Sequence, residues 1–162
     1  MKIAVTGHTG AIGSEICKLL DDVKGFSRSN GYDIRTDRDR ILMEADDCDV
    51  FINLANSEYA ATDMLIELFD EWKDERKQII NIGSAIADYY DMRLDLASYA
   101  AQKAALKQVA KMLNHQKTTC EVRYLSFGYI DTPRMREKYP EATDRMSTEE
   151  AARIICSLIS NT

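Results

Sequence analysis

The segment TGHTGAIG at residues 6–13 constrains the fold of this chain more than any other feature. An apolar run at residues 2–6, typical of a buried strand, leads into it, and residues 13–20 have the spacing of an amphipathic helix. Gly7 permits a tight turn, Gly10 lets a ligand approach the backbone, and Gly13 lets the helix pack closely on the strand. The segment therefore predicts the first β–α unit of a parallel sheet.

The rest of the chain alternates apolar runs with helical patterns. Further strands are predicted at residues 23–27, 49–55, 78–83 and 120–125, with a vestigial third strand at 32–34, and helices at 38–45, 60–73 and 98–113. A closing helix begins after Ser147, whose hydroxyl can cap it in the S-x-x-E pattern that Glu150 completes. This alternation predicts an α/β fold, a Rossmann-type doubly wound parallel sheet of about six strands with a reduced third strand, in three layers.

No linker, repeat or low-complexity segment divides the sequence, and 162 residues suffice for one domain with its own core. We therefore expect residues 1–162 to form a single domain. Both prolines, Pro133 and Pro140, fall in the irregular region at residues 131–146, which we expect to be a mobile substrate loop.

Composition excludes several classes of protein. The net charge of −6 argues against a general nucleic-acid binder, because clustered Lys and Arg hold phosphate backbones. No stretch approaches about 18 consecutive apolar residues and the start has no leader pattern, so neither a membrane span nor secretion is expected. The cysteines are far apart with no paired spacing, and the two histidines are separated. We expect free thiols, no metal site and a reduced, cytoplasmic location.

The glycine-rich turn has the sequence context of a dinucleotide site, with a strand before it and a helix after it. Backbone N–H groups and the positive helix end can hold a diphosphate there, which favours a binding turn over a turn without a ligand. The chain is thus predicted to be an NAD(P)-binding Rossmann domain. The cofactor-binding residues expected in the turn are Gly7, Thr9, Gly10, Ala11, Ile12 and Gly13.

The segment after the second strand indicates which dinucleotide is bound. NAD-specific folds commonly place an acidic residue there, whereas an arginine suits the 2′-phosphate of NADP. This chain has Ser27, Arg28 and Ser29, a guanidinium flanked by two hydroxyls. We therefore favour NADP(H) over NAD(H). The alternative is a surface arginine in a polar loop.

Ser84, Tyr99 and Lys103 are the candidate catalytic residues. Tyr99 and Lys103 are four residues apart on a predicted helix and so share a face. A free phenol, with a pKa of about 10, holds its proton at neutral pH, and a nearby ammonium is expected to make it a better acid and a usable base. Ser84, at the end of the fourth long strand, can donate a hydrogen bond to a substrate oxygen. The alternative for Tyr99 and Lys103 is an ordinary exposed helix pair.

These pieces, taken in order, resemble the short-chain dehydrogenase/reductase family over essentially the whole chain. The matching motifs are residues 6–13, the strand end at 53–56, NIGS at 81–84, YAAQKAA at 99–105, and SFGYIDT at 126–132. The resemblance implies an NADP(H)-dependent oxidoreductase that reduces a small carbonyl or oxidises the corresponding alcohol. It implies further cofactor contacts from Leu54, Ala55, Asn56, Tyr99, Lys103, Gly128, Ile130 and Thr132, with Lys103 on the nicotinamide ribose. The alanine-rich helix from Ser98 leads us to expect a homodimer or higher homo-oligomer.

Several departures from the family pattern keep two alternatives open. The glycine spacing is that of the family's extended branch, which favours a nucleotide-sugar-type enzyme, although such enzymes resemble longer chains. The family's helix Asn has no match between Ala60 and Lys73, and the sequence ends where compact members add a last strand. Those two departures favour a catalytically silent sensor or scaffold that binds dinucleotide. The substrate-facing residues are expected at 89–96 and 133–146.

Overall fold

Five parallel strands form one sheet in the computed structural model, in the order β2-β1-β3-β4-β5. The structure describes residues 1–89 and 94–159. The strands are β1 (Ile3–Thr6), β2 (Val23–Phe26), β3 (Val50–Asn53), β4 (Gln78–Ser84) and β5 (Glu121–Phe127). The predicted α/β fold with a parallel sheet is confirmed, with strand bounds within about two residues of those expected.

The sheet order changes direction beside β1. The chain runs from β1 to β2 on one side, then crosses back so that β3 pairs with the other side of β1, and Ile3 lies level with both Val23 and Val50. Ligands of open α/β sheets bind at such a reversal, outside the carboxyl ends of the strands. The topology thus selects the end of β1 as the place for a site.

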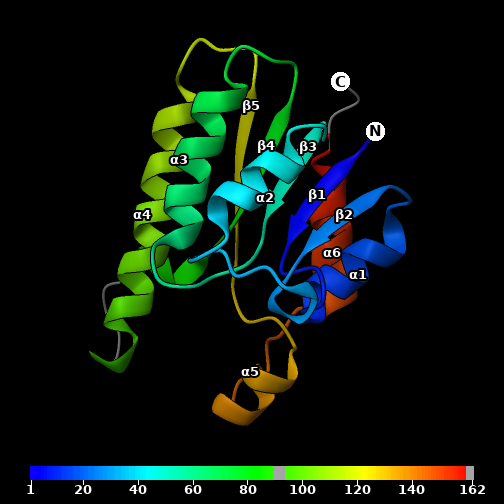
Figure 1. The fold of residues 1–162 in the computed structure, drawn as a ribbon. Coiled ribbons are helices and arrows are strands. Elements are labelled where there is room, and N and C mark those ends of the chain that lie inside the picture. Colours follow the sequence, from blue (N-terminus) through cyan, green and yellow to red (C-terminus); the bar gives the residue numbers. More distant parts are fainter. Residues whose placement is uncertain (90–93, 160–162) are drawn as a thin grey trace.

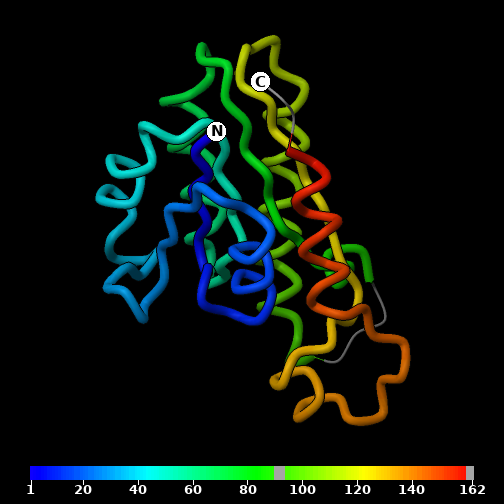
Figure 2. Tube along the Cα trace, turned by 90° about the vertical axis from the view of Figure 1, so that its right-hand side faces the viewer, coloured from blue at the N-terminus to red at the C-terminus, as the bar shows by residue number. Residues whose placement is uncertain are grey.

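Helices cover both faces of the sheet, which confirms the predicted three layers (Figures 1 and 2). One face packs against α1 (Ala11–Leu19) and α6 (Thr148–Ser157), and the other against α2 (Arg38–Ala45), α3 (Ala60–Trp72) and α4 (Ala97–Asn114). The Ser147 hydroxyl accepts the N–H of Glu150 at 3.1 Å and so caps α6, as the sequence predicts. None of the helices in the described ranges is long and apolar enough to cross a membrane.

The core is built by alternation along the central strands. Ala4, Phe51 and Ile79 face the α3–α4 layer, where the Phe51 ring meets Trp72 edge to face at 6.3 Å between centroids. Their neighbours along the same strands, such as Val5 and Ile52, face α1 and α6. All residues of β1 and β3 are buried, as expected for strands covered on both faces.

The expected third strand at residues 32–34 is absent, so the sheet has five strands rather than six. The segment closes local turns instead. The N–H of Asp33 donates to the Asp37 carboxylate at 2.9 Å, and the N–H of Arg35 donates to the Asp33 carboxylate at 2.9 Å. Aspartates that capture nearby backbone N–H groups favour turns over a sheet ladder.

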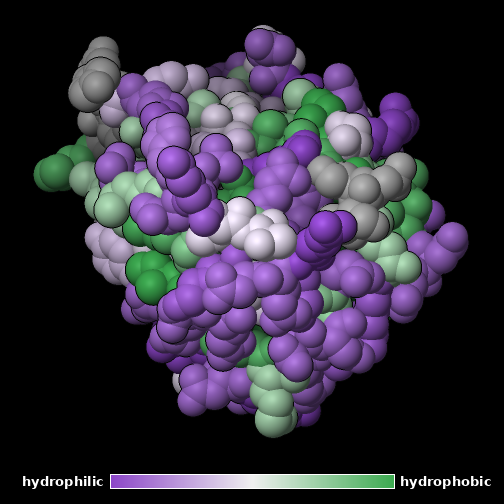
Figure 3. Space-filling view, turned by 90° about the horizontal axis from the view of Figure 1, so that it is seen from above, coloured by the Kyte–Doolittle hydropathy of each residue, from purple (hydrophilic) through white to green (hydrophobic). Residues whose placement is uncertain are grey.

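Residues 131–146, expected to be irregular, contain a short helix, α5 (Pro133–Lys138). Thr132 caps this helix by accepting the N–H of Met135 at 3.2 Å, and a parallel bridge between Ile130 and Met146 closes the base of the excursion. This segment extends beyond the carboxyl edge of the sheet (Figures 1 and 2). The opposite end of the molecule presents mainly hydrophilic side chains (Figure 3).

Candidate functional site

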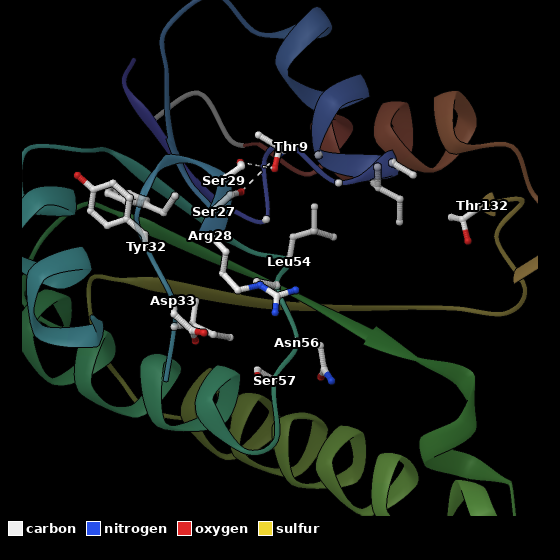
Figure 4. A pocket seen from close by; sticks show the side chains of 18 residues that line it. Thr9, Ser27, Arg28, Ser29, Tyr32, Asp33, Leu54, Asn56, Ser57 and Thr132 are labelled. Atoms are coloured by element: carbon white, nitrogen blue, oxygen red, sulfur yellow. Dashed lines mark hydrogen bonds between the residues drawn. The ribbon is translucent and has the colours of Figure 1, made fainter. Parts of the chain in front are cut away.

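A cavity of about 560 Å³ lies at the carboxyl ends of β1, β2 and β3, at the reversal of strand order. Its walls come from the glycine-rich turn, the segment after β2 and residues 54–57 after β3. Thr132 and Tyr32 lie at opposite ends of the lining, with Arg28 between them (Figure 4). The cavity is therefore long, with the glycine-rich turn on one wall.

Most of the predicted cofactor-binding residues line this cavity. They are Gly7, Thr9, Gly10, Ala11, Ile12, Gly13, Ser27, Arg28, Ser29, Leu54, Ala55, Asn56 and Thr132. Gly128 and Ile130 do not. Gly128 is exposed, and Ile130, 9% exposed, packs into the apolar layer against α6. Tyr99 and Lys103 lie apart from the lining, beside Ser84.

The glycine-rich turn is built for close contact. Gly7 adopts a left-handed backbone with φ of +72°, and its N–H donates to the Phe26 carbonyl at 2.7 Å. A side chain at Gly13 would collide with the Gly7 carbonyl, so α1 begins directly on the end of β1. Gly10 precedes α1 without a side-chain cap, and no acidic residue lies in the first turn. The first N–H groups of α1 are thus available to an anion.

Thr6 joins the ends of β1 and β3 beneath the cavity. Its Oγ1 accepts the N–H groups of Leu54 and Ala55 at 3.0 and 3.1 Å, and Thr6 is fully buried. These bonds fix the backbone of two predicted cofactor contacts. The sequence does not predict this role, because a threonine at a strand end has many other uses.

His8 holds the segment after β2, a role the sequence argument missed. Its Nδ1 lies 2.9 Å from Ser27 Oγ, which also accepts the N–H of Thr9 at 3.3 Å, and Thr9 Oγ1 lies 3.0 Å from Ser29 Oγ (Figure 4). The imidazole packs on Gly25, where a side chain would collide with its ring. Gly25 in β2 was the available signal, since a glycine within a strand often marks a close approach.

Arg28 extends into the middle of the cavity (Figure 4). Within residues 1–89 and 94–159 it forms no ion pair. Among the described lining residues the one carboxylate is that of Asp33, which is held by Arg35: the Arg35 N–H donates to it and the guanidinium lies 3.6 Å away. These contacts, with a smaller effect of Arg28, lower the pKa of Asp33. The lining thus contains a guanidinium, that of Arg28, without an ion-pair partner in the described ranges, and a carboxylate, that of Asp33, already bound by Arg35.

A dinucleotide fits this lining. The volume lies within the usual range for ligand pockets, and the donors that face it are those an anionic diphosphate requires: helix N–H groups, hydroxyls and a guanidinium. Ile34, which lines the end near Tyr32, can border a base. Phe26, Tyr32 and Ser57 also line the cavity and were not anticipated.

Ser84, Tyr99 and Lys103 come together beside the cavity. Ser84 ends β4, and its Oγ accepts the N–H of Ile86 at 3.4 Å. Tyr99 lies in the first turn of α4 and is 37% exposed. Lys103 is only 4% exposed, and its Nζ lies 5.9 Å from the centroid of the Tyr99 ring. The predicted proximity of phenol and amine is thus present.

The electrostatic expectation for Tyr99 is wrong in this structure. Burial raises the pKa of Tyr99 and outweighs the hydrogen bonding of Ser84 and the charge of Arg134, both of which lower it. Lys103 hydrogen-bonds to the backbone. Its Nζ donates to the Ile82 carbonyl at 3.1 Å, and burial lowers the pKa of Lys103 to about 8. Desolvation therefore governs both groups.

The predicted substrate-facing segments are described in part. Residues 90–93, which include the candidates Tyr90 and Met92, lie outside the described residues. Arg134 and Tyr139, in and after α5, both act on the pKa of Tyr99, so the 131–146 segment lies near the phenol. Asp131 holds the segment through Arg136, with two contacts of 2.7 Å.

No family model and no curated protein matches the sequence, but solved structures match its fold. A short-chain dehydrogenase from Burkholderia cenocepacia in complex with NADP is 20% identical, with a TM-score of 0.80, covering 100% of this chain and 87% of that one. The 3-alpha-hydroxysteroid dehydrogenase from Pseudomonas sp. B-0831, complexed with NADH, is 16% identical, with a TM-score of 0.80 and coverage of 99% and 90%. L-sorbose reductase from Gluconobacter frateurii, complexed with NADPH and L-sorbose, is 16% identical, with a TM-score of 0.73 and coverage of 99% and 90%. The chain has the fold of the short-chain dehydrogenases/reductases.

The packing of His8 on Gly25 can be tested by a double-mutant cycle. Gly25→Ala is expected to destabilise the protein by about 1–3 kcal/mol, because the new methyl group collides with the imidazole. In the His8→Ala background the same change is expected to cost much less, a coupling of about 1 kcal/mol or more measured by urea unfolding. Equal costs in the two backgrounds would contradict the contact.

Burial of Lys103 predicts a pH-dependent stability. The pKa falls from 10.5 to about 8 on folding, so below pH 8 the folded protein carries the full cost of a buried ammonium. At pH values between these two pKa values the unfolded chain still binds the proton that folded Lys103 has lost. The free energy of unfolding therefore rises with pH in this range. Lys103→Met lacks this dependence. Urea unfolding should show the variant gaining most over wild type near pH 7 and progressively less towards pH 9.5, whereas a gap independent of pH would argue against the buried charge.

Proposed function

We propose that this protein is an NADP(H)-dependent oxidoreductase that reduces a small carbonyl compound or oxidises the corresponding alcohol, with Ser84, Tyr99 and Lys103 as its catalytic residues. The observation that carries the proposal is the placement of two halves of a site on one edge of the sheet. The ends of β1, β2 and β3 form a cavity suited to a dinucleotide, and Ser84 at the end of β4 meets Tyr99 and Lys103 from α4.

The similar structures support a nicotinamide cofactor. By their names they are dehydrogenases and reductases, and they hold NADP, NADH or NADPH. The preference for NADP(H) rests on this chain's own residues. Arg28 has no carboxylate partner in the described ranges and faces the cavity between two hydroxyls, whereas Asp33 is engaged by Arg35. A guanidinium with free donors suits a 2′-phosphate.

Each side chain has a definable task in this proposal. The bound dinucleotide supplies or accepts the hydride. Tyr99, whose raised pKa keeps the phenol protonated at neutral pH, donates its proton to the carbonyl oxygen. Ser84, which acts on the pKa of Tyr99, orients the same oxygen. Lys103, whose Nζ donates to the Ile82 carbonyl near the Tyr99 ring, is assigned the role of holding a ribose hydroxyl.

In the reductive direction the protonated phenol supplies the proton that the oxygen takes up when a carbonyl becomes an alcohol. The expected partners are a small carbonyl or alcohol substrate and a second copy of the chain. The homo-oligomer through α4, the cytoplasmic location and the single-domain organisation stay predictions.

Arg28 is expected to discriminate between the cofactors. Arg28→Ala should weaken NADPH binding by about 10- to 100-fold and NADH binding little, because a charge-assisted hydrogen bond contributes about 1.5–3 kcal/mol. The measurement is a parallel fluorescence titration with NADPH and NADH. Arg153→Ala, an exposed arginine on α6, is the matched control and should bind both as wild type does. Equal losses for both cofactors would refute the 2′-phosphate assignment.

Tyr99→Phe is expected to separate binding from turnover. The phenyl ring keeps the packing but has no proton to give, so kcat should fall by about 10²- to 10⁴-fold while the Kd for NADPH stays near that of wild type. Activity is followed as NADPH consumption over a panel of small aldehydes, ketones and ketoses. Unchanged turnover in the variant would remove Tyr99 from the mechanism. Tight NADPH binding by wild type without turnover of any member would favour the silent dinucleotide-binding protein instead.

A further inference from the structure

Tyr124 occupies the side-chain space beside Gly83, the residue before Ser84. Tyr124 lies on β5 level with Asn81 of β4, and its ring leans over Gly83 further along the strand. A side chain at position 83 would collide with the Tyr124 hydroxyl and the ring carbon that bears it. Glycine is unfavourable inside a strand unless another group approaches closely, and here the approaching group is a phenol.

The Tyr124 hydroxyl is buried and completes no hydrogen bond with any of the described residues. Burial raises the pKa of Tyr124 to about 12, Ser84's backbone lies near enough to lower it, and Asp88 and Tyr99 raise it. The phenol therefore stays protonated at neutral pH. Its polar end points towards the residues proposed to carry out the chemistry.

An unpaired buried hydroxyl is costly, since phenylalanine would fill the same space without it. The ring alone explains the contact with Gly83 and the packing against the α4 layer, where Tyr124 borders the apolar cluster. The hydroxyl needs a separate explanation. Ser84 directly follows Gly83, its backbone acts on the pKa of Tyr124, and Ser84 in turn acts on the pKa of Tyr99.

We propose that Tyr124 is a positioning residue for the Ser84–Tyr99 pair, and that its hydroxyl donates a hydrogen bond into this pair when Tyr99 loses its proton. The ring, seated on Gly83, fixes the end of β4 that carries Ser84. The hydroxyl stabilises the negative charge that forms when Tyr99 gives up its proton. This role rests on the proposed oxidoreductase function and adds a residue to its site.

Tyr124→Phe tests the hydroxyl while keeping the ring. We expect thermal stability equal to or above that of wild type, an unchanged Kd for NADPH and an unchanged KM, and a kcat about three- to tenfold lower, the effect of one lost hydrogen bond. Tyr59→Phe, an exposed tyrosine at the start of α3, is the matched control and should leave kcat unchanged.

A second readout does not need turnover. The difference between the ultraviolet titration curves of the wild type and the Tyr99→Phe variant isolates the ionisation of Tyr99. In the Tyr124→Phe background we expect the pKa of Tyr99 to be higher than in the wild type. If Tyr124 were merely structural, Tyr124→Phe would leave both kcat and the pKa of Tyr99 unchanged. An unchanged kcat or an unchanged pKa of Tyr99 would overturn the proposal. If wild type turns over no carbonyl, the proposed function fails, and the titration still decides whether Tyr124 acts on Tyr99.

Discussion

The close approach of α1 to the end of β1 sets the geometry on which the rest of the site depends. The helix can begin there only because position 13 has no side chain to collide with the Gly7 carbonyl, and because Gly7 turns the chain with a positive φ. This contact leaves the first N–H groups of α1 free at the mouth of the cavity. It also brings His8 over Gly25, so that the same turn anchors the Ser27–Ser29 segment through hydrogen bonds. One backbone contact thus links the glycine-rich wall of the cavity to the segment that we propose distinguishes NADP from NAD.

The sequence was sufficient for those parts of the fold that depend on local pattern. Apolar runs followed by helical spacing predicted five strands and the three layers, the S-x-x-E pattern predicted the cap at Ser147, and the glycine-rich turn predicted one wall of the cavity. The vestigial strand at 32–34 was wrong because periodicity does not reveal that Asp33 and Asp37 satisfy backbone N–H groups locally. Ile130 was expected at the cofactor, but its apolar side chain is buried against α6, and a sequence does not show which face of a bend an isoleucine takes.

The electrostatics of the site depend on burial, which no sequence motif reports. Spacing placed Tyr99 and Lys103 together, but the shift in the pKa of Tyr99 has the opposite sign from that expected. Lys103 sits inside the protein against a carbonyl, and Tyr99 loses more solvation than its neighbours restore. His8 and Tyr124 were missed for a related reason. Each matters through contact with a glycine on a neighbouring strand, Gly25 or Gly83, and those pairings exist only in three dimensions.

The end of β4 is where the contacts of the proposed catalytic residues meet. Three consecutive residues carry three different contacts: the Ile82 carbonyl accepts from Lys103, Gly83 receives the ring of Tyr124, and Ser84 interacts with Tyr99. Parallel pairing with β5 continues to Ser84, level with Phe127, so the segment is held rigidly up to its last residue. Rigid support of this kind is what proton transfer between fixed groups requires. Two features at this strand end oppose stability and have no structural purpose of their own. They are the buried amine of Lys103 and the buried hydroxyl of Tyr124, which has no hydrogen-bond partner among the described residues. Their concentration beside a cavity suited to a dinucleotide supports the proposal that this edge of the sheet serves catalysis rather than binding alone.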